Sequence, residues 1–119
     1  MTRWILVVED HEPSRTLVEH VLRHAGLAVR GAGSVPEARR LLPERPSLVL
    51  LDLHVPGGGG EAFLAEIRAT PESAATPVVA VTGAIEEGPD RFLAAGFDGF
   101  IAKPISVRLL PETVRKYLG

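Results

Sequence analysis

Short apolar runs alternate with stretches of helical periodicity along the whole of this sequence. Each run is continuous rather than alternating with polar residues, which is typical of strands that are buried on both faces of a sheet. The run over 27–30 is the weakest, and the run over 48–51 is the most apolar. The five predicted strands cover residues 4–8, 27–30, 48–51, 78–81 and 100–102.

Helical spacing fills the intervals between the predicted strands. Over 14–25, apolar residues recur at the three- and four-residue spacing of a helix, and Gly26 provides a stop signal. The other predicted helices begin after Ser34 and after the glycine run 57–60, and span 86–95 and 106–118.

Capping and breaking residues modify these helices. Ser34 and Glu37 match a capping box, in which the serine caps the helix and the glutamate reaches back to the capping residue. Pro111 lies inside the last predicted helix, where it removes a hydrogen bond and is expected to kink or restart the helix. Gly88 and Pro89 weaken the helix predicted over 86–95.

Five strand–helix units in this order favour an α/β fold with a doubly wound, five-stranded parallel sheet and helices on both faces. The 119 residues are close to the commonest domain size, so a single domain over 1–119 is predicted. In sheets of this kind, ligands bind beyond the carboxyl ends of the strands. The polar residues at those ends are therefore the candidates for function.

The composition is that of an ordinary globular protein, with 45% hydrophobic and 24% charged residues. There is no Cys, which excludes disulfides, thiolate metal sites and cysteine nucleophiles. A net charge of −2 gives no electrostatic attraction to nucleic acid or to an anionic membrane. No apolar run approaches the roughly 18 residues of a membrane span, so we expect a cytoplasmic protein without membrane insertion.

The chain also has no Asn, no Gln and a single Met, while Arg outnumbers Lys by 11 to 2. Proteins of hyperthermophiles tend to lose these thermolabile residues, so a thermophilic source is one hypothesis. A GC-rich genome, which favours codons for Arg, Ala, Gly and Pro, accounts equally well for the same composition.

Charged and hydroxyl residues gather where the predicted strands end. Glu9 and Asp10 follow the first strand, Asp52 the third, Thr82 the fourth and Lys103 the fifth. The whole chain has only four Asp and two Lys, so solubility is a poor explanation for two Asp and one Lys at one edge. This edge of the sheet is therefore the predicted functional site.

The residue types at this edge suit phosphoryl chemistry. Crowded carboxylates repel one another, so the site should bind protons or hold a cation, and Mg²⁺ prefers oxygen ligands. Lys103 would add a fixed positive charge, and Thr82 would add a hydroxyl donor. A cation, an ammonium and a hydroxyl around one carboxylate can stabilise a phosphoryl group in transfer, and the carboxylate itself can be the nucleophile.

Short motifs surround these residues. They are Val8-Glu9-Asp10, Leu51-Asp52-Leu53, Val55-Pro56-Gly57, Val81-Thr82-Gly83 and Phe100-Ile101-Ala102-Lys103-Pro104, with Ala95-Gly96-Phe97-Asp98-Gly99 before the last. In these motifs, and in their order along essentially the whole chain, the sequence resembles the receiver domains of response regulators in two-component signalling. The resemblance implies a flavodoxin-like fold and a phosphoacceptor module, either a stand-alone receiver or a receiver cut from a hybrid kinase.

By this resemblance, Asp52 is the phosphoacceptor and takes a phosphoryl group from a phosphohistidine on a sensor histidine kinase or a histidine phosphotransfer protein. The transfer would use Mg²⁺, with Mn²⁺ as an alternative ion. The implied metal ligands are the side chains of Glu9, Asp10 and Asp52 and the main-chain carbonyl of His54. Apart from its own phosphorylation and autodephosphorylation, the protein would not be an enzyme, and its output would go to an unknown downstream protein.

The resemblance also assigns the residues that respond to the phosphoryl group. Lys103 would contact the phosphoryl oxygens, Thr82 would move to hydrogen-bond them, and Phe100 would turn inward with Thr82 at the aromatic switch position. The Lys103–Pro104 peptide bond would be cis.

The chain departs from the family pattern in ways that bear on its output. Glu9 stands where Asp is usual, a change that leaves the metal site intact. The span from Thr82 to Gly96 is shorter than the common pattern, and Pro111 interrupts the last helix. We therefore expect an altered output face, which in this family consists of the fourth helix, fifth strand and fifth helix.

The histidines have competing interpretations. His54 lies two residues after Asp52, where its imidazole is a candidate for tuning the lifetime of the phosphoryl group, and an exposed loop histidine without a role is the alternative. His20 and His24 have the spacing of a metal-binding pair on a helix. Because the sequence offers them no third ligand, a solvated helix face is expected there.

Other functions remain open from the residues alone. An aspartyl-nucleophile phosphatase of the haloacid-dehalogenase kind would need a second acid two residues after the nucleophile, where His54 stands. A flavodoxin-like cofactor binder or a non-phosphorylated interaction module would have the same fold, because a fold does not determine a function. Gly119 directly follows the last predicted helix, so we expect output through the surface of this domain or through phosphoryl relay.

Overall fold

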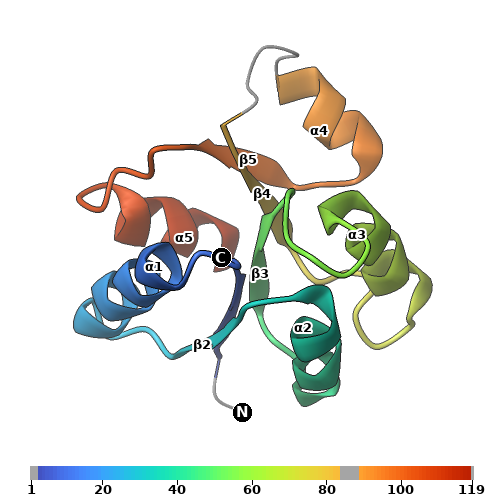
Figure 1. Cartoon of the computed structure of the whole chain (residues 1–119), viewed down its shortest axis with the longest axis horizontal. Helices are drawn as coiled ribbons and strands as arrows, with labels where there is room; N and C mark the ends of the chain where they lie inside the picture. Colours follow the sequence, from blue (N-terminus) through green and yellow to red (C-terminus); the bar gives the residue numbers. More distant parts are fainter. Residues whose placement is uncertain (1–2, 84–88, 119) are drawn as a thin grey trace.

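A five-stranded parallel sheet forms the centre of the molecule, with the strand order β2-β1-β3-β4-β5 (Figure 1). The computed structural model describes residues 3–83 and 89–118. Neighbouring strands pair in parallel throughout. The strands are β1 (Ile5–Val8), β2 (Val29–Ala32), β3 (Leu48–Asp52), β4 (Val78–Thr82) and β5 (Gly99–Ala102). This architecture confirms the doubly wound α/β fold that the sequence predicted.

Helices cover both faces of the sheet, with α1 and α5 on one face and α2, α3 and α4 on the other (Figure 1). A short 3-10 helix, η1 (Leu42–Glu44), follows α2. The α-helices are α1 (Glu12–His24), α2 (Val35–Leu41), α3 (Gly60–Ala69), α4 (Pro89–Ala95) and α5 (Leu110–Leu118). Among the helices of 3–83 and 89–118, none combines the length and the apolar character that a membrane span requires.

Two hydrophobic cores, one on each face of the sheet, explain the continuous apolar strands. In β1, Leu6 and Val8 belong to the core under α2, α3 and α4, whereas Ile5 and Val7 belong to the core under α1 and α5. Successive side chains of a strand point to opposite faces, so a strand between two helix layers, such as β1, carries apolar side chains on both faces.

Strand β2 lies two residues later than the predicted 27–30, so that predicted boundary was wrong. The N–H of Leu27 donates to the carbonyl of Leu22 at 3.0 Å, and the chain is therefore still closing the end of α1 at this point. Parallel pairing begins only when Val29 comes opposite Ile5.

The last helix also begins later than the predicted 106–118, because α5 starts at Leu110. Residues 107–109 form a turn, and the carbonyl of Ser106 accepts a hydrogen bond of 3.0 Å from the N–H of Leu110. Pro111 therefore lies in the first turn, where its missing N–H has no partner to lose. Of the helix predicted over 86–95, α4 accounts for Pro89 onward, and residues 86–88 lie outside the described residues.

The caps of the first two helices also differ from the predicted pattern. Helix α1 begins before the predicted residue 14, since Nδ1 of His11 accepts the N–H of Ser14 at 3.3 Å and caps the helix. Ser34 caps α2, as the sequence predicted, and accepts the N–H of Glu37 at 3.3 Å. The carboxylate of Glu37 accepts the N–H of Gly33 at 2.8 Å, one residue before the capping serine. The predicted contact from Glu37 back to the capping residue itself was therefore wrong.

Candidate functional site

Three carboxylates meet at the carboxyl end of the sheet because β1 and β3 are neighbours. Glu9 and Asp10 directly follow β1, and Asp52 is the last residue of β3. One ligand oxygen from each of the three residues lies within 4.8 Å of the others. The structure thus brings together the acids that the sequence placed at two separate strand ends.

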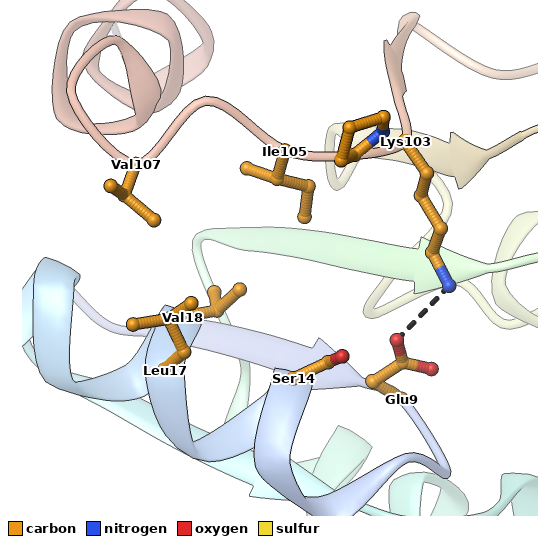
Figure 2. Close-up of a pocket in the computed structure, with 8 residues that line it drawn as sticks. Glu9, Ser14, Leu17, Val18, Lys103, Ile105 and Val107 are labelled. Carbon is orange, nitrogen blue, oxygen red and sulfur yellow. Dashed lines mark hydrogen bonds and ion pairs between the residues drawn. The ribbon is translucent and has the colours of Figure 1, made fainter.

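Lys103 reaches these acids from the far edge of the sheet. It follows β5, and β4 lies between β5 and β3. Its Nζ donates a hydrogen bond of 2.9 Å to Oδ2 of Asp52 and one of 3.0 Å to Oε1 of Glu9. Figure 2 shows the lysine side chain extending from the segment after β5 toward Glu9. One ammonium therefore bridges the two buried carboxylates.

Asp52 is enclosed and held at both of its oxygens. The residue is 3% exposed, Oδ2 receives the hydrogen bond from Lys103, and Oδ1 accepts the main-chain N–H of His54 at 2.9 Å. A carbonyl role and an imidazole role were predicted for His54 from the sequence, but this N–H was not. A main-chain donor leaves no signal in the residue types, since every residue other than proline carries one.

Burial and hydrogen bonding move the pKa values of the two buried acids in opposite directions. Burial, reinforced by the hydrogen bond with Asp52, raises the pKa of Glu9 to about 7 although Lys103 opposes the shift. Burial would also raise the pKa of Asp52, but hydrogen bonds from Glu9, His54 N–H and Lys103 outweigh it and hold that pKa below its usual range. Without a metal, Glu9 is thus the residue that takes up a proton while Asp52 stays ionised.

The charge of Lys103 is secured by the same contacts. Burial alone would lower the pKa of its ammonium, but the hydrogen bonds to Asp52 and Glu9 raise it above the usual value. The site consequently keeps a fixed positive charge beside an ionised carboxylate.

The oxygen donors of this site fit a hard divalent cation. Oε2 of Glu9 is buried and receives no hydrogen bond from the described residues, so this oxygen must carry a proton or face a cation. Asp10 is exposed to solvent, which leaves room for the water molecules that Mg²⁺ retains. Carboxylate oxygens from Glu9, Asp10 and Asp52 could therefore hold Mg²⁺.

The remaining predicted residues lie on β4, on β5 and directly after β5. Thr82 ends β4, is fully buried, and its carbonyl accepts the N–H of Lys103 at 2.9 Å. Phe100 in β5 stacks on Phe92 of α4, with ring centroids 5.4 Å apart. The Lys103–Pro104 peptide bond is cis.

A groove opens beside the site between α1 and the segment after β5. Its volume is about 470 Å³, and its walls are mostly apolar. Figure 2 shows Leu17 and Val18 of α1 on one side and Ile105 and Val107 on the other, with Lys103 at one end.

Comparison with known proteins gives the class of this molecule. The family model of the response regulator receiver domain matches residues 5–115, so the chain belongs to that family. Receiver domains are generally signalling modules of two-component systems that bind Mg²⁺ and interact with histidine kinases and downstream targets. The family confirms the resemblance seen in the sequence and does not favour the phosphatase or the flavodoxin-like alternatives.

Individual relatives cover the chain from end to end. It is 32% identical to the polar-differentiation response regulator DivK of Brucella ovis, with 100% of this chain and 98% of the relative covered. The solved receiver domain of NtrX from Brucella abortus is 31% identical, with a TM-score of 0.85 and coverage of 96% and 97%. The chemotaxis response regulator CheY4 of Vibrio cholerae is 25% identical, with a TM-score of 0.88 and coverage of 98% and 99%.

Proposed function

We propose that Asp52 is the phosphoacceptor of a two-component or phosphorelay module and receives its phosphoryl group from a histidine kinase or a histidine phosphotransfer protein. The observation that carries this proposal is the 2.9 Å hydrogen bond from Lys103 Nζ to Oδ2 of Asp52, a residue that is 3% exposed. Together with the hydrogen bonds from Glu9 and the N–H of His54, the contact helps to keep Asp52 ionised, and it places a cation where phosphoryl charge would develop.

In the proposed transfer, an oxygen of Asp52 attacks the phosphorus of a phosphohistidine. The new P–O bond forms as the P–N bond breaks, and the electron pair of that bond returns to the imidazole nitrogen, which is then free to take a proton. The product is an aspartyl phosphate. The ammonium of Lys103 would move from the carboxylate oxygen to the phosphoryl oxygens.

Glu9, Asp10 and Asp52, with the main-chain carbonyl of His54, would hold Mg²⁺ or Mn²⁺ in this site. When bound, the ion neutralises charge on the phosphoryl oxygens and helps to align the reacting groups. Its double charge would also compensate the carboxylate repulsion that a proton on Glu9 relieves in its absence.

Thr82 and Phe100 would convert phosphorylation into a change of surface. The hydroxyl of Thr82 would hydrogen-bond the phosphoryl oxygens, and Phe100 would turn inward as Thr82 moves. Because Phe100 stacks on Phe92, a rotation of its ring would disturb the packing of α4. The altered surface would then be read by a downstream protein in the cytoplasm.

The exposed imidazole of His54 would tune the lifetime of the aspartyl phosphate. Its main-chain N–H already contacts Asp52, so its exposed side chain is attached to the backbone close to the proposed phosphorylation site. A neighbouring imidazole can take or give a proton near neutral pH and can thereby influence attack by water.

Incubation of the whole chain with Mg²⁺ and a small acyl phosphate, followed by intact mass spectrometry, tests the proposal. We expect the gain of one phosphoryl group, which should disappear with Asp52→Asn or with EDTA in place of Mg²⁺. Asp90→Asn, at an exposed position of α4, is the matched control and should keep the gain. An unchanged mass of the wild-type protein, with both the acyl phosphate and phosphorylated histidine donors, would overturn the proposal.

A further inference from the structure

The main chain of Glu9 is held at both of its polar groups. Strand pairing of β1 ends at Val8, and the N–H of Glu9 donates to the carbonyl of Ala32 at 2.9 Å. The carbonyl of Glu9 accepts a hydrogen bond of 2.9 Å from Nη1 of Arg15. A side chain from α1 therefore supplies the donor for a carbonyl that lies beyond the strand ladder.

Arg15 reaches this carbonyl by passing over glycines of β2 and the loop after it. A Cβ atom on Gly31 would stand 2.9 Å from Cδ of Arg15 and would also collide with the carboxylate of Glu19. A Cβ atom on Gly33 would stand 3.1 Å from Nη1 of Arg15. Neither glycine has a positive φ, so the backbone does not require glycine there. What these positions provide is the space through which the arginine passes.

We infer that Arg15 is a positioning residue for the metal-binding pair Glu9 and Asp10, an inference that rests on the function proposed above. The peptide unit between the two acids is planar, so fixing the carbonyl of Glu9 also fixes the direction of the bond to Asp10. Arg15 itself would contact neither the ion nor the phosphoryl group. It acts through the main chain, as hydrogen bonds behind metal ligands commonly do.

Charge and positioning make opposite predictions for the loss of Arg15. A guanidinium near a cation site repels Mg²⁺, so removal of its charge alone would strengthen Mg²⁺ binding. Removal of its hydrogen bond would loosen the peptide that carries both acids and would weaken binding. The sign of the change in affinity therefore separates the two effects.

Arg23 provides a matched control on the same helix. Its Nη2 donates to the main-chain carbonyl of Val29 at 3.0 Å, so it makes the same type of bond from α1 to a main-chain carbonyl, but in β2 and not after β1. Val29 lies at the start of its strand, whereas the metal-binding acids lie at the carboxyl ends. Arg23→Ala should cost comparable stability without affecting the site.

The test is a titration of the wild-type chain and its variants with Mg²⁺, followed by the chemical shifts of the main-chain amides around Asp52. We expect Arg15→Ala to raise the dissociation constant for Mg²⁺ about tenfold. Arg23→Ala should leave it unchanged, and Arg15→Lys, which keeps a donor, should recover part of the loss. Urea denaturation verifies that each variant is folded at the titration temperature.

Gly31→Ala removes no charge and should also weaken Mg²⁺ binding, because the new methyl group displaces Arg15. Since that methyl group also displaces Glu19, Glu19→Ala is its control and should bind Mg²⁺ as the wild type does.

Each outcome has a distinct meaning. Equal or tighter Mg²⁺ binding by Arg15→Ala, or an equal loss in Arg23→Ala, would overturn the inference while the metal site stands. Absence of Mg²⁺ binding by the wild-type chain would instead overturn the proposed metal site, and the inference would fall with it.

Discussion

Asp52 and Lys103 are 51 positions apart in the sequence, and Nζ of Lys103 donates a hydrogen bond of 2.9 Å to Oδ2 of Asp52. The same ammonium contacts Glu9 at 3.0 Å. The exposed fractions of the two side chains in the first pair are 35% for the lysine and 4% for the aspartate. The lysine side chain is thus partly exposed to solvent while its ammonium contacts a buried acid. Its substitution gives the most direct test of the site.

Lys103→Met should slow phosphorylation by a small acyl phosphate on the order of 100-fold, because it removes the ammonium that stabilises charge on the transferred group. The measurement is a time course of intact mass in Mg²⁺. Lys116→Met, at an exposed position of α5, is the control and should react at the wild-type rate. An unaltered rate in Lys103→Met would contradict the role assigned to the lysine.

The stability of the metal-free protein should depend on pH through Glu9, whose pKa of about 7 lies above its ordinary value of 4.5. Asp52 and Lys103 face this carboxyl, Asp10 lies beside it, and Arg15 holds its main chain. A raised pKa contributes stability that is present below pH 4.5 and is lost as the pH rises through about 7.

Glu9→Gln removes this ionisation, so in EDTA its stability curve should be flatter than that of the wild type between pH 4.5 and 7. The lowered pKa of Asp52 has the opposite effect, but it acts below the ordinary value of 3.8 and therefore outside this window. Urea denaturation at a series of pH values gives both curves. Parallel curves for the two proteins would rule out Glu9 as the source.

Mg²⁺ should stabilise the wild-type protein against unfolding by about 2.7 kcal/mol when its concentration is 100 times the dissociation constant. Asp10→Asn should abolish most of this gain because one of the three clustered carboxylates is lost. Since Asp10 is exposed, its substitution should change the metal-free stability by less than about 0.5 kcal/mol. Denaturation with Mg²⁺ and with EDTA measures both effects, and a full gain in Asp10→Asn would remove Asp10 from the ligand set.

Phe92→Ala should lower the free energy of unfolding by about 3–5 kcal/mol, because it leaves a cavity under α4. Phe92 is fully buried and contacts the rings of Phe97 and Phe100, at centroid distances of 6.3 Å and 5.4 Å. Leu93→Ala, at a neighbouring position that is 55% exposed, should cost less than about 0.5 kcal/mol. Similar losses in the two variants would show that α4 is held by contacts other than these rings.

His54→Ala should change the rate at which the aspartyl phosphate is lost, because a neighbouring imidazole can influence the attack of water on the phosphoryl group. The extent of phosphorylation should be retained, because the main-chain N–H that contacts Asp52 is present in both proteins. Mass spectrometry after removal of the phosphodonor gives the rates. Identical rates of loss in the two proteins would assign no role to the imidazole.

The predicted sheet and its layers followed from the apolar runs, because burial between two helix layers favours apolar side chains on both faces of a strand, as over 48–51. The clustering of the candidate acids Glu9, Asp10 and Asp52 followed as well, since the carboxyl ends of parallel strands share one edge. The start of α5 was harder to predict, because Pro111 is compatible with a kink inside a helix and with the first turn of a helix. Leu110 is buried at the start of α5, and its packing selects the first turn. The later start of β2 was also hard to predict, because it depends on the hydrogen bond from the N–H of Leu27 that ends α1.

By itself, the sequence determined the fold class, the family and the candidate acids. Hydrophobic periodicity and the polar residues at the strand ends depend only on which residue types occur at which positions. Only the tertiary structure decided that Lys103 bridges Glu9 and Asp52, that the N–H of His54 binds Asp52, and that Arg15 holds Glu9. Two of these contacts, those of His54 and Arg15, involve main-chain atoms, which are the same at almost every residue. The bridge formed by Lys103 depends on how far its side chain reaches across β4. Such contacts arise from the distances between packed elements, and the order of residue types does not specify those distances.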